Sequence, residues 1–522
     1  MDSRYRIMLA PMAAICLSAI GCASVDPAAD YDRARQSILE ATGSSDAHSP
    51  GDDEAANAAI RELLVREINC DDAVRISLIN NPRLRAAFFD VGMARADLVQ
   101  SGLFSNPTLA LSIAFPDGGG RSNIQGTFAQ NIVDLWQIPI RKRVSEQLLD
   151  AAVLEVARLA VQLAVDTRGS FFSAVAADRL AAIARENVAI ARELFDIAET
   201  RRQAGAVGNL DVNLAQGAVF SAELELERSR LEAASARRRL ATLLGILDEA
   251  ETLKLSSAPF TSMTLPLDAN QVVNYALANR LDVQIAQLQV EADRRRVRLE
   301  IAKVLPDLSI GVYNERTEQR ALPARNILGD TARASVAAGG LTAPDVQSRD
   351  QRSEERGKEI ENIIGPAFSL TIPIFDQNQA QIARAKLAYE QSAMKLDALQ
   401  REITQAVRQG VDQAETSRRV RSYFSEKLLP QAQSNLELSR QSYLAGRASL
   451  IVMLDAQRVF LAARRDSIIA ERESAVALAE LERLTARPLA RIADSSSSAS
   501  QPIARVEPQP AAVPTQLPGG SR

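Results

Sequence analysis

The clearest pattern along the chain is an alternation of apolar residues with small or polar ones in short runs. In the first run, Leu109, Leu111 and Ile113 alternate with Ala110 and Ser112. The runs lie at about 107–115, 124–133, 306–313 and 366–374. A period of two predicts β-strands with one apolar and one polar face. Each run has the length of a tilted membrane-barrel strand, although a soluble sheet packed on a core would alternate in the same way.

Helical patterns occupy most of the remaining chain. Long helices are predicted over about 136–245 and 378–487, and each stretch is interrupted by a short turn, at Gly205 and at Gly446. The helix before the first turn would be on the order of 100 Å long at 1.5 Å per residue. Pro430 should kink the corresponding helix of the second half or mark a helix junction.

The order of these elements repeats, because the chain is an internal duplication. Residues 73–113 align without a gap onto residues 272–312, and Ala204–Gly205 later matches Ala445–Gly446. Self-similarity in this order indicates two structural repeats. An insertion at about 314–363 lies between the two strands of the second repeat.

Each repeat opens with a helical stretch, at roughly 71–104 and 268–304. Pro82 should break the first of these stretches into a short and a longer helix. A barrel built from these strands would need several chains, because four strands cannot close one and an open sheet edge in lipid is untenable.

The N-terminus has the pattern of a secretory signal. Basic residues precede an apolar run from Ile7 to Ile20, which is too short to span a bilayer comfortably. The run ends in Ala19-Ile20-Gly21-Cys22, which resembles a bacterial lipobox with Cys22 as the lipidated residue. An ordinary signal with an incidental cysteine is the alternative. In bacterial lipoproteins, an aspartate directly after the lipidated cysteine favours retention in the inner membrane. This chain has Ala23 at that position, so the resemblance favours the outer membrane.

These patterns divide the chain into six segments. They are a signal peptide at 1–21, a lipid-anchored N-terminal linker at 22–70, a first repeat at 71–250, an equatorial inter-repeat segment at 251–267, a second repeat at 268–488 and a disordered tail at 489–522.

Composition narrows the function. The 522-residue chain has a formal net charge of −4, so no nucleic-acid-binding surface is expected. His48 is the single histidine and Cys70 the single cysteine beyond residue 22, which argues against a histidine-built metal site, a catalytic triad and a disulfide framework. The sequence has no phosphate-binding glycine loop. We therefore expect a protein that is not an enzyme and needs neither a cofactor nor a metal.

Three segments carry a resemblance to a known family: Asn106–Leu109, Gly365–Asp376 and, most specifically, Tyr443–Gln457. With the lipobox and the duplicated order of elements, they resemble the TolC-type outer-membrane efflux proteins over roughly residues 70–488. The resemblance implies a mainly α fold with a membrane β-barrel, in which long coiled-coil helices form a periplasmic α-barrel. It also implies a homotrimer whose protomers each give four strands to one 12-stranded barrel.

By the same resemblance, the protein is the passive exit duct of a tripartite efflux system. An inner-membrane transporter supplies the energy, and a periplasmic adaptor (membrane fusion) protein joins it to the duct. A type I protein-secretion duct and a lipid-anchored periplasmic coiled-coil protein without a pore are the alternatives. The alternating strands argue against the poreless protein, and the substrate is not readable from the sequence.

The resemblance also selects candidate residues for docking the adaptor. They lie in the two helix turns and are Gly205, Val207, Asn209, Gly446, Ala448, Ser449 and Leu450. Plain turn chemistry would explain the glycines equally well. We also expect Asn209 and Ser449 to cap the returning helices.

A further set of residues should line the narrow periplasmic entrance. Asp455 matches an aspartate of the family, and three copies would form a ring of negative charge that attracts cations. Val452 stands where a family member has a second aspartate, which makes this entrance less acidic. Tyr443 matches a tyrosine of the family's closing network. A solvated aspartate on a helix face is the alternative for Asp455. The insertion at 314–363 should be an extracellular loop, either capping the exit or simply exposed.

Overall fold

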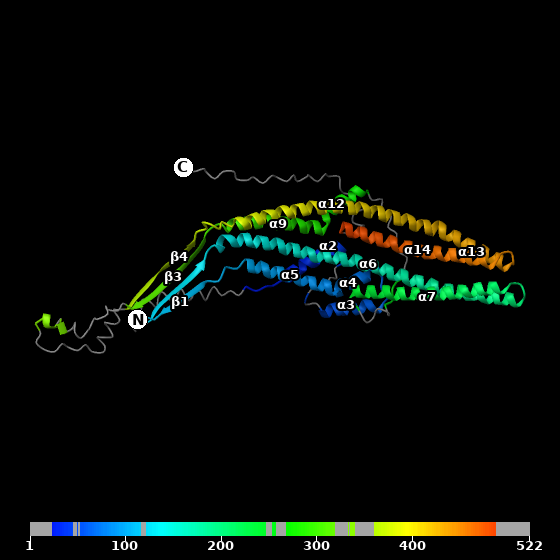
Figure 1. Ribbon diagram of the computed structural model, residues 1–522, viewed down its shortest axis with the longest axis horizontal. Helices are drawn as coiled ribbons and strands as arrows, with labels where there is room; N and C mark the ends of the chain where they lie inside the picture. The colour runs from blue at the N-terminus through cyan, green and yellow to red at the C-terminus, as the bar shows by residue number, and fades with distance from the viewer. Residues whose placement is uncertain are drawn as a thin grey trace.

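A computed structural model describes residues 23–44, 50, 53–115, 122–246, 253–256, 268–318, 332–333, 335–339 and 360–486. These residues form an elongated molecule, with a four-stranded sheet at one end and long helices extending from it (Figure 1). Cys22, the signal peptide, most of the 314–363 insertion and the tail at 489–522 lie outside the described residues, so the expectations about them stay predictions.

Both halves contribute the same order of elements. The first half contains α4 (Cys70–Asn80), α5 (Pro82–Ser101), β1 (Thr108–Ala114), β2 (Asn123–Asn131), α6 (Asp134–Gln203) and α7 (Asn209–Leu244). The second contains α8 (Ala269–Asn279), α9 (Leu281–Ala302), β3 (Asp307–Glu318), β4 (Ile360–Thr371), α12 (Gln379–Tyr423), the π-helix η1 (Phe424–Leu428), α13 (Leu429–Leu444) and α14 (Leu450–Thr485). The predicted duplication and mainly helical fold are confirmed.

The opening helical stretch is broken in both halves. Pro82 begins α5, and the side chain of Asn81 accepts a hydrogen bond from the Arg83 N–H at 2.9 Å. The second half breaks at Arg280 without a proline, which the sequence did not predict. There the backbone is extended, and the guanidinium of Arg280 donates to both carboxylate oxygens of Asp282, which holds the break.

The long helices differ between the halves. α6 runs uninterrupted for 70 residues, so it is roughly 105 Å long, and Pro139 lies within its first turns without breaking it. Its counterpart is divided, because α12 ends at Tyr423 and η1 separates it from α13, which holds Pro430 in its first turn. The predicted junction at Pro430 is confirmed. Within the described ranges, no helix is both long and apolar enough to cross a membrane.

The segment at 22–70 is more than a linker, because it contains α2 (Ala28–Thr42) and α3 (Asp53–Val65). α2 buries Ala34 and Ile38 in a core shared with α5 and α6. The ring of Tyr31 meets that of Phe88 edge to face, with centroids 6.0 Å apart. The four-residue spacing of Ala34 and Ile38 is a helical signal that the prediction of a linker overlooked.

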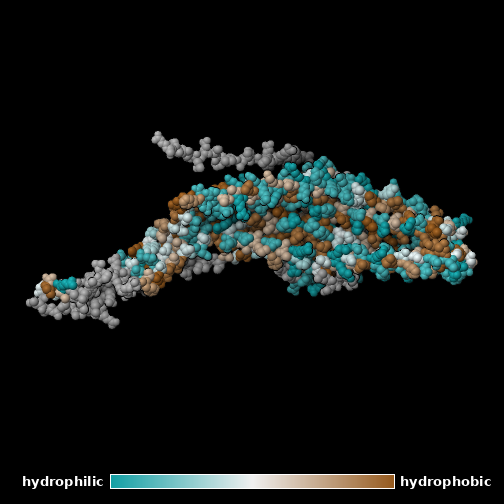
Figure 2. All heavy atoms as spheres, in the orientation of Figure 1, coloured by the Kyte–Doolittle hydropathy of each residue, from teal (hydrophilic) through white to brown (hydrophobic). Residues whose placement is uncertain are grey.

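The strands pair antiparallel in the order β1-β2-β3-β4. On one face Leu109 lies opposite Phe128, and Ile310 lies opposite Phe368. The other face carries small and polar pairs such as Ser112 with Gln125 and Ser309 with Ser369. Leu109 and Phe368 are 75% and 69% exposed, so this apolar face is uncovered in the protomer. Apolar residues, brown in Figure 2, are visible at the surface of the strands.

Two strands have different ends from those predicted. β3 continues to Glu318 instead of ending at 313, and β4 spans Ile360–Thr371 instead of 366–374. The pairing continues through polar residues, for example Arg316 opposite Asn362. Backbone hydrogen bonds need no apolar side chain, so the ladder extends beyond the alternating pattern and shortens the predicted 314–363 loop.

Candidate functional site

The two helix turns lie side by side at the end of the molecule opposite the sheet (Figure 1). One turn joins α6 to α7 and the other joins α13 to α14. Arg201 of α6 connects them, because its Nη1 donates to the carbonyl oxygen of Tyr443 at 2.9 Å. Its guanidinium carbon also lies 4.8 Å from the centre of the Tyr443 ring. We call residues 194–215 and 440–458 the helix tips and treat them as the candidate site.

Both turns use the same backbone geometry. Gly205 and Gly446 have φ angles of 72° and 73°, in the left-handed region that favours glycine. The N–H of Ala206 donates to the carbonyl of Arg201, and the N–H of Arg447 returns to the preceding helix in the same way. These bonds close helix C-termini. Turn chemistry therefore accounts for both glycines, and their role in docking stays a prediction.

The expectation that Asn209 and Ser449 cap the returning helices is wrong. Gly208 occupies the N-cap position of α7, which makes Asn209 the first helical residue. Ser449 does occupy the N-cap position of α14, but its side chain makes no capping hydrogen bond. Asn209 and Ser449 are both exposed, so their polar groups face water.

The remaining predicted docking residues are divided between surface and core. Val207 and Ala448 are half-buried on the turns. Leu450 and Tyr443 are buried in one apolar cluster. Its other members are Leu194, Ala198, Ala215 and Met453. Leu450 and Tyr443 therefore hold the helix tips together, while Val207 and Ala448 reach the surface.

The predicted entrance residues Val452 and Asp455 lie on an exposed face of α14. Val459 lies one further turn along the same face, and Val452 and Val459 are 51% and 49% exposed. A carboxylate oxygen of Asp455 accepts a hydrogen bond from Nη2 of Arg458 at 2.6 Å. Since Arg458 offsets its charge, Asp455 lies in a face that is more apolar and less acidic than the aspartate alone suggests.

Sequence reasoning missed the polar contacts that join the two hairpins. Two hydrogen bonds add to the contact between Arg201 and Tyr443. Glu193 accepts a hydrogen bond from Arg440 at 3.1 Å, and Gln457 donates one to Asn187 at 3.0 Å. One signal pointed to Arg201. It is a basic residue in the last turn of α6, one turn before Gly205, and the duplication aligns Gly205 with Gly446.

A groove runs along the hairpins behind the helix tips. It has a volume of about 460 Å³ and is lined by α6, α7 and α14. Gln457 and Arg458 of α14 contribute to its lining. The Gln457 side chain is buried, and its Oε1 accepts no hydrogen bond from the described residues. The groove is therefore partly apolar, and the buried Gln457 amide forms part of its wall through the hydrogen bond to Asn187.

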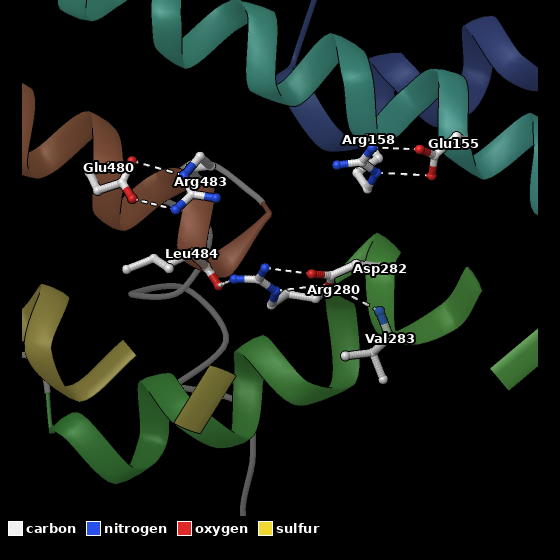
Figure 3. A network of polar contacts seen from close by, with 8 residues as sticks. All are labelled: Glu155, Arg158, Arg280, Asp282, Val283, Glu480, Arg483 and Leu484. Carbon is white, nitrogen blue, oxygen red and sulfur yellow. Dashed lines mark hydrogen bonds and ion pairs between the residues drawn. The ribbon is translucent and has the colours of Figure 1, made fainter. Parts of the chain in front are cut away.

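A network of polar residues from α6, the start of α9 and the end of α14 lies where the two halves meet (Figure 3). Arg280 donates to the two oxygens of Asp282 at 2.9 and 2.6 Å and to the carbonyl of Leu484 at 3.3 Å. Arg158 and Arg483 flank this pair around a cavity of about 90 Å³. Burial alone would raise the pKa of Asp282, but the hydrogen bonds and charge of Arg280, helped by Arg158, hold it below its usual value.

We expect this network to stabilise the fold in a pH-dependent way. Because the pKa of Asp282 is lower in the folded chain, its carboxylate contributes stability above the unfolded pKa of about 3.9. That contribution is lost as the pH falls through the folded value. Asp282→Asn should therefore lower the thermal unfolding midpoint at neutral pH and have little effect in strong acid.

Circular dichroism melts across this pH range measure the effect. Asp397→Asn is the matched control, because Asp397 is an exposed partner of Arg401 and should contribute little at any pH. Equal destabilisation by Asp282→Asn at neutral and acid pH would contradict the assignment.

Comparisons with known proteins agree with this architecture. The family model described as outer membrane efflux protein matches residues 73–246 and 272–487. The chain is similar to the pyoverdine export outer membrane protein OpmQ of Pseudomonas aeruginosa, with 23% identity over 418 residues, covering 76% of this chain and 80% of OpmQ. It is also similar to the cobalt-zinc-cadmium resistance protein CzcC of Cupriavidus metallidurans, with 22% identity over 402 residues, 76% of this chain and 85% of CzcC.

A solved structure shares the fold. The CmeC outer membrane channel of Campylobacter jejuni superposes with a TM-score of 0.62 at 17% identity, covering 80% of this chain and 85% of CmeC. Since the family model spans most of both halves, this chain belongs to the outer membrane efflux protein family.

Proposed function

We propose that this protein is the passive outer-membrane exit duct of a tripartite efflux system. The observation that carries the proposal is the four-stranded sheet, whose apolar face is uncovered while its other face is small and polar. In a membrane the apolar face meets lipid and the polar face lines water. The sheet continues directly into α6, which is roughly 105 Å long and would extend the duct into the periplasm.

The duct is a homotrimer in this proposal. β1 and β4 are the edge strands of the sheet, and an unpaired edge is not stable in lipid. Pairing β1 of one protomer with β4 of the next removes every edge and closes one shared barrel. The chain would also be anchored through a lipidated Cys22, which Ala23–Pro27 would connect to α2 on the helical body.

The helix tips are the docking site for a periplasmic adaptor, which connects the duct to an energy-supplying inner-membrane transporter. Gly205, Asn209, Gly446 and Ser449 are exposed there, and Val207 and Ala448 are half-buried beside them. Small side chains permit close approach of a partner helix. Leu450 supports this surface from beneath, and the groove that includes Gln457 extends it along the hairpins.

The entrance lies at the same end. Three copies of the Val452, Asp455 and Val459 face would surround the axis, with Arg458 offsetting part of the acidic charge. We therefore propose an entrance with a weak cation preference. OpmQ and CzcC bear the names of different cargoes, so no particular cargo is proposed for this chain.

Removing the contact between the hairpins should open the entrance. Charge-assisted hydrogen bonds contribute about 1.5–3 kcal/mol, so Arg201→Ala should raise the ratio of open to closed entrances by roughly tenfold or more. Single-channel recording in planar bilayers, with wild type beside the variant, measures this ratio.

Arg202→Ala is the matched control, because the neighbouring Arg202 pairs with Glu199 on its own helix. We expect this variant to conduct like wild type. Equal open fractions in wild type and Arg201→Ala would contradict a closing role for Arg201.

A further inference from the structure

We propose that Glu315, held in place by Tyr313 and Gln125, makes the outer end of the barrel prefer cations to anions. The inference rests on the proposed duct, because it needs the polar face of the sheet to line water. It concerns the exit, at the opposite end of the molecule from the helix tips, and it identifies a residue that selects among solutes by their charge.

The register of the strands places these three residues on the polar face of the sheet. Gln125 of β2 lies directly opposite Glu315 of β3, and Tyr313 precedes Glu315 by two residues, so the three side chains share one face. β2 begins at Asn123 and β3 ends at Glu318, so all three lie near the end of the sheet that is remote from the helices. In the proposed duct this end opens to the exterior.

The long side chains of this face stand out from a row of small ones. Ile363 of β4 lies beside Glu315 and continues its row. Two rows closer to the helices, Gly311 lies between Ala129 and Ala367. Side chains of a barrel strand stand roughly perpendicular to the sheet, so a longer side chain reaches farther from the wall. Glu315 therefore carries its charge toward the axis of the lumen.

Both oxygens of the Glu315 carboxylate accept a hydrogen bond. Nε2 of Gln125 donates to Oε1 at 2.8 Å, and the hydroxyl of Tyr313 donates to Oε2. Gly365 lies opposite Tyr313, yet nothing lies within 4 Å of the Cβ that Gly365 would gain, so the Tyr313 ring is turned away from it and toward Glu315. Amide and phenol groups are uncharged, so these donors orient the carboxylate without cancelling its charge.

The charges on the polar face of the four strands have one sign. Its charged residues are Asp307, Glu315 and Glu361, all of them acidic. Arg316 is the only basic residue of these strands, and it lies opposite Asn362 on the other face. Three protomers would therefore surround the exit with acidic side chains, the arrangement by which pores favour cations.

The width of the barrel lets this charge act across the lumen. Twelve strands spaced about 4.8 Å apart and tilted by about 40° enclose a cylinder with a radius of about 12 Å. The Debye length at physiological ionic strength is about 8 Å, so three carboxylates that project inward still act at the axis. We expect them to favour a monovalent cation over a monovalent anion by roughly three- to tenfold.

Thiol-modification rates test this preference. Ser112→Cys places a reporter in the row of Glu315, because Ser112 lies opposite Gln125 on the same face. Trimers in lipid vesicles are treated with trimethylammonioethyl or sulfonatoethyl methanethiosulfonate, a cationic and an anionic reagent, present on both sides of the membrane. Burial raises the pKa of Cys70 to about 12, so this thiol reacts slowly, and protein without the reporter gives the background rate.

With Glu315 present, the cationic reagent should react roughly three- to tenfold faster than the anionic one. Glu315→Gln keeps the size of the side chain and should bring the two rates close together, and Glu315→Ser serves if that variant does not fold. Glu318→Gln is the matched control, because Glu318 lies opposite Ile360 on the other face of the same strand and should leave the ratio unchanged.

Two results would contradict the proposal in different ways. Equal rates for the two reagents, or a ratio that survives the loss of the Glu315 charge, would overturn the cation preference of the exit. A Ser112→Cys thiol that reacts no faster than an Ile113→Cys thiol on the opposite face would show that the polar face does not line water, which would overturn the proposed duct itself.

Discussion

Arginine at Phe368 should prevent the protein from inserting into membranes, whereas arginine at the adjacent Ser369 should be tolerated. Phe368 projects from the uncovered apolar face of the sheet, and Ser369 lies opposite Ser309 on the polar face. A lipid-facing arginine near the bilayer midplane costs about 2–4 kcal/mol, and a trimer would carry three of them. A lumen-facing arginine is hydrated and avoids that cost.

The two variants are compared by the fraction of protein that forms trimers in lipid vesicles. Both variants introduce the same side chain at neighbouring positions, and the two arginines lie on opposite faces of the sheet. If Phe368→Arg and Ser369→Arg insert equally well, the assignment of the two faces to lipid and water is wrong.

Alanine at Gly311 should disrupt the sheet, while alanine at Gly365 should leave it intact. A Cβ at Gly311 would lie 2.2 Å from the carbonyl oxygen of Phe128 and 2.9 Å from the Cα of Ala129. These are backbone atoms of β2, which cannot rotate away as a side chain does. Overpacking typically costs about 1–3 kcal/mol, and a clash between backbones lies at or above the upper end of that range.

Gly365 is the matched control because it also lies in a strand, and nothing lies within 4 Å of the Cβ that it would gain. Thermal stability and trimer yield measure both effects. Retention of wild-type stability by Gly311→Ala would show that β2 and β3 do not pair in the register described.

Features with a local cause were predictable from the sequence. The alternation around Leu109 and Phe368 predicted the strands, and the duplicated glycines predicted two turns at matching places. Pro82 and Pro430 marked helix junctions because a proline acts on its own backbone.

Features that depend on distant partners were not predictable. The break at Arg280 is held by Asp282 and by the carbonyl of Leu484, which lies far away in the sequence. Arg201 gains its role only because folding places it beside Tyr443 from the other half. The same holds for α2, whose docking depends on residues of α5 and α6.

Solute flux through purified trimers distinguishes a passive duct from a protein without a pore. Arg201→Ala trimers are reconstituted into liposomes, and osmotic swelling is followed in sugars of increasing size with no nucleotide or ion gradient supplied. We expect swelling whose rate falls gradually as the sugar grows, since a passive duct discriminates mainly by size. Folded, membrane-inserted trimers that admit no sugar would contradict the exit duct.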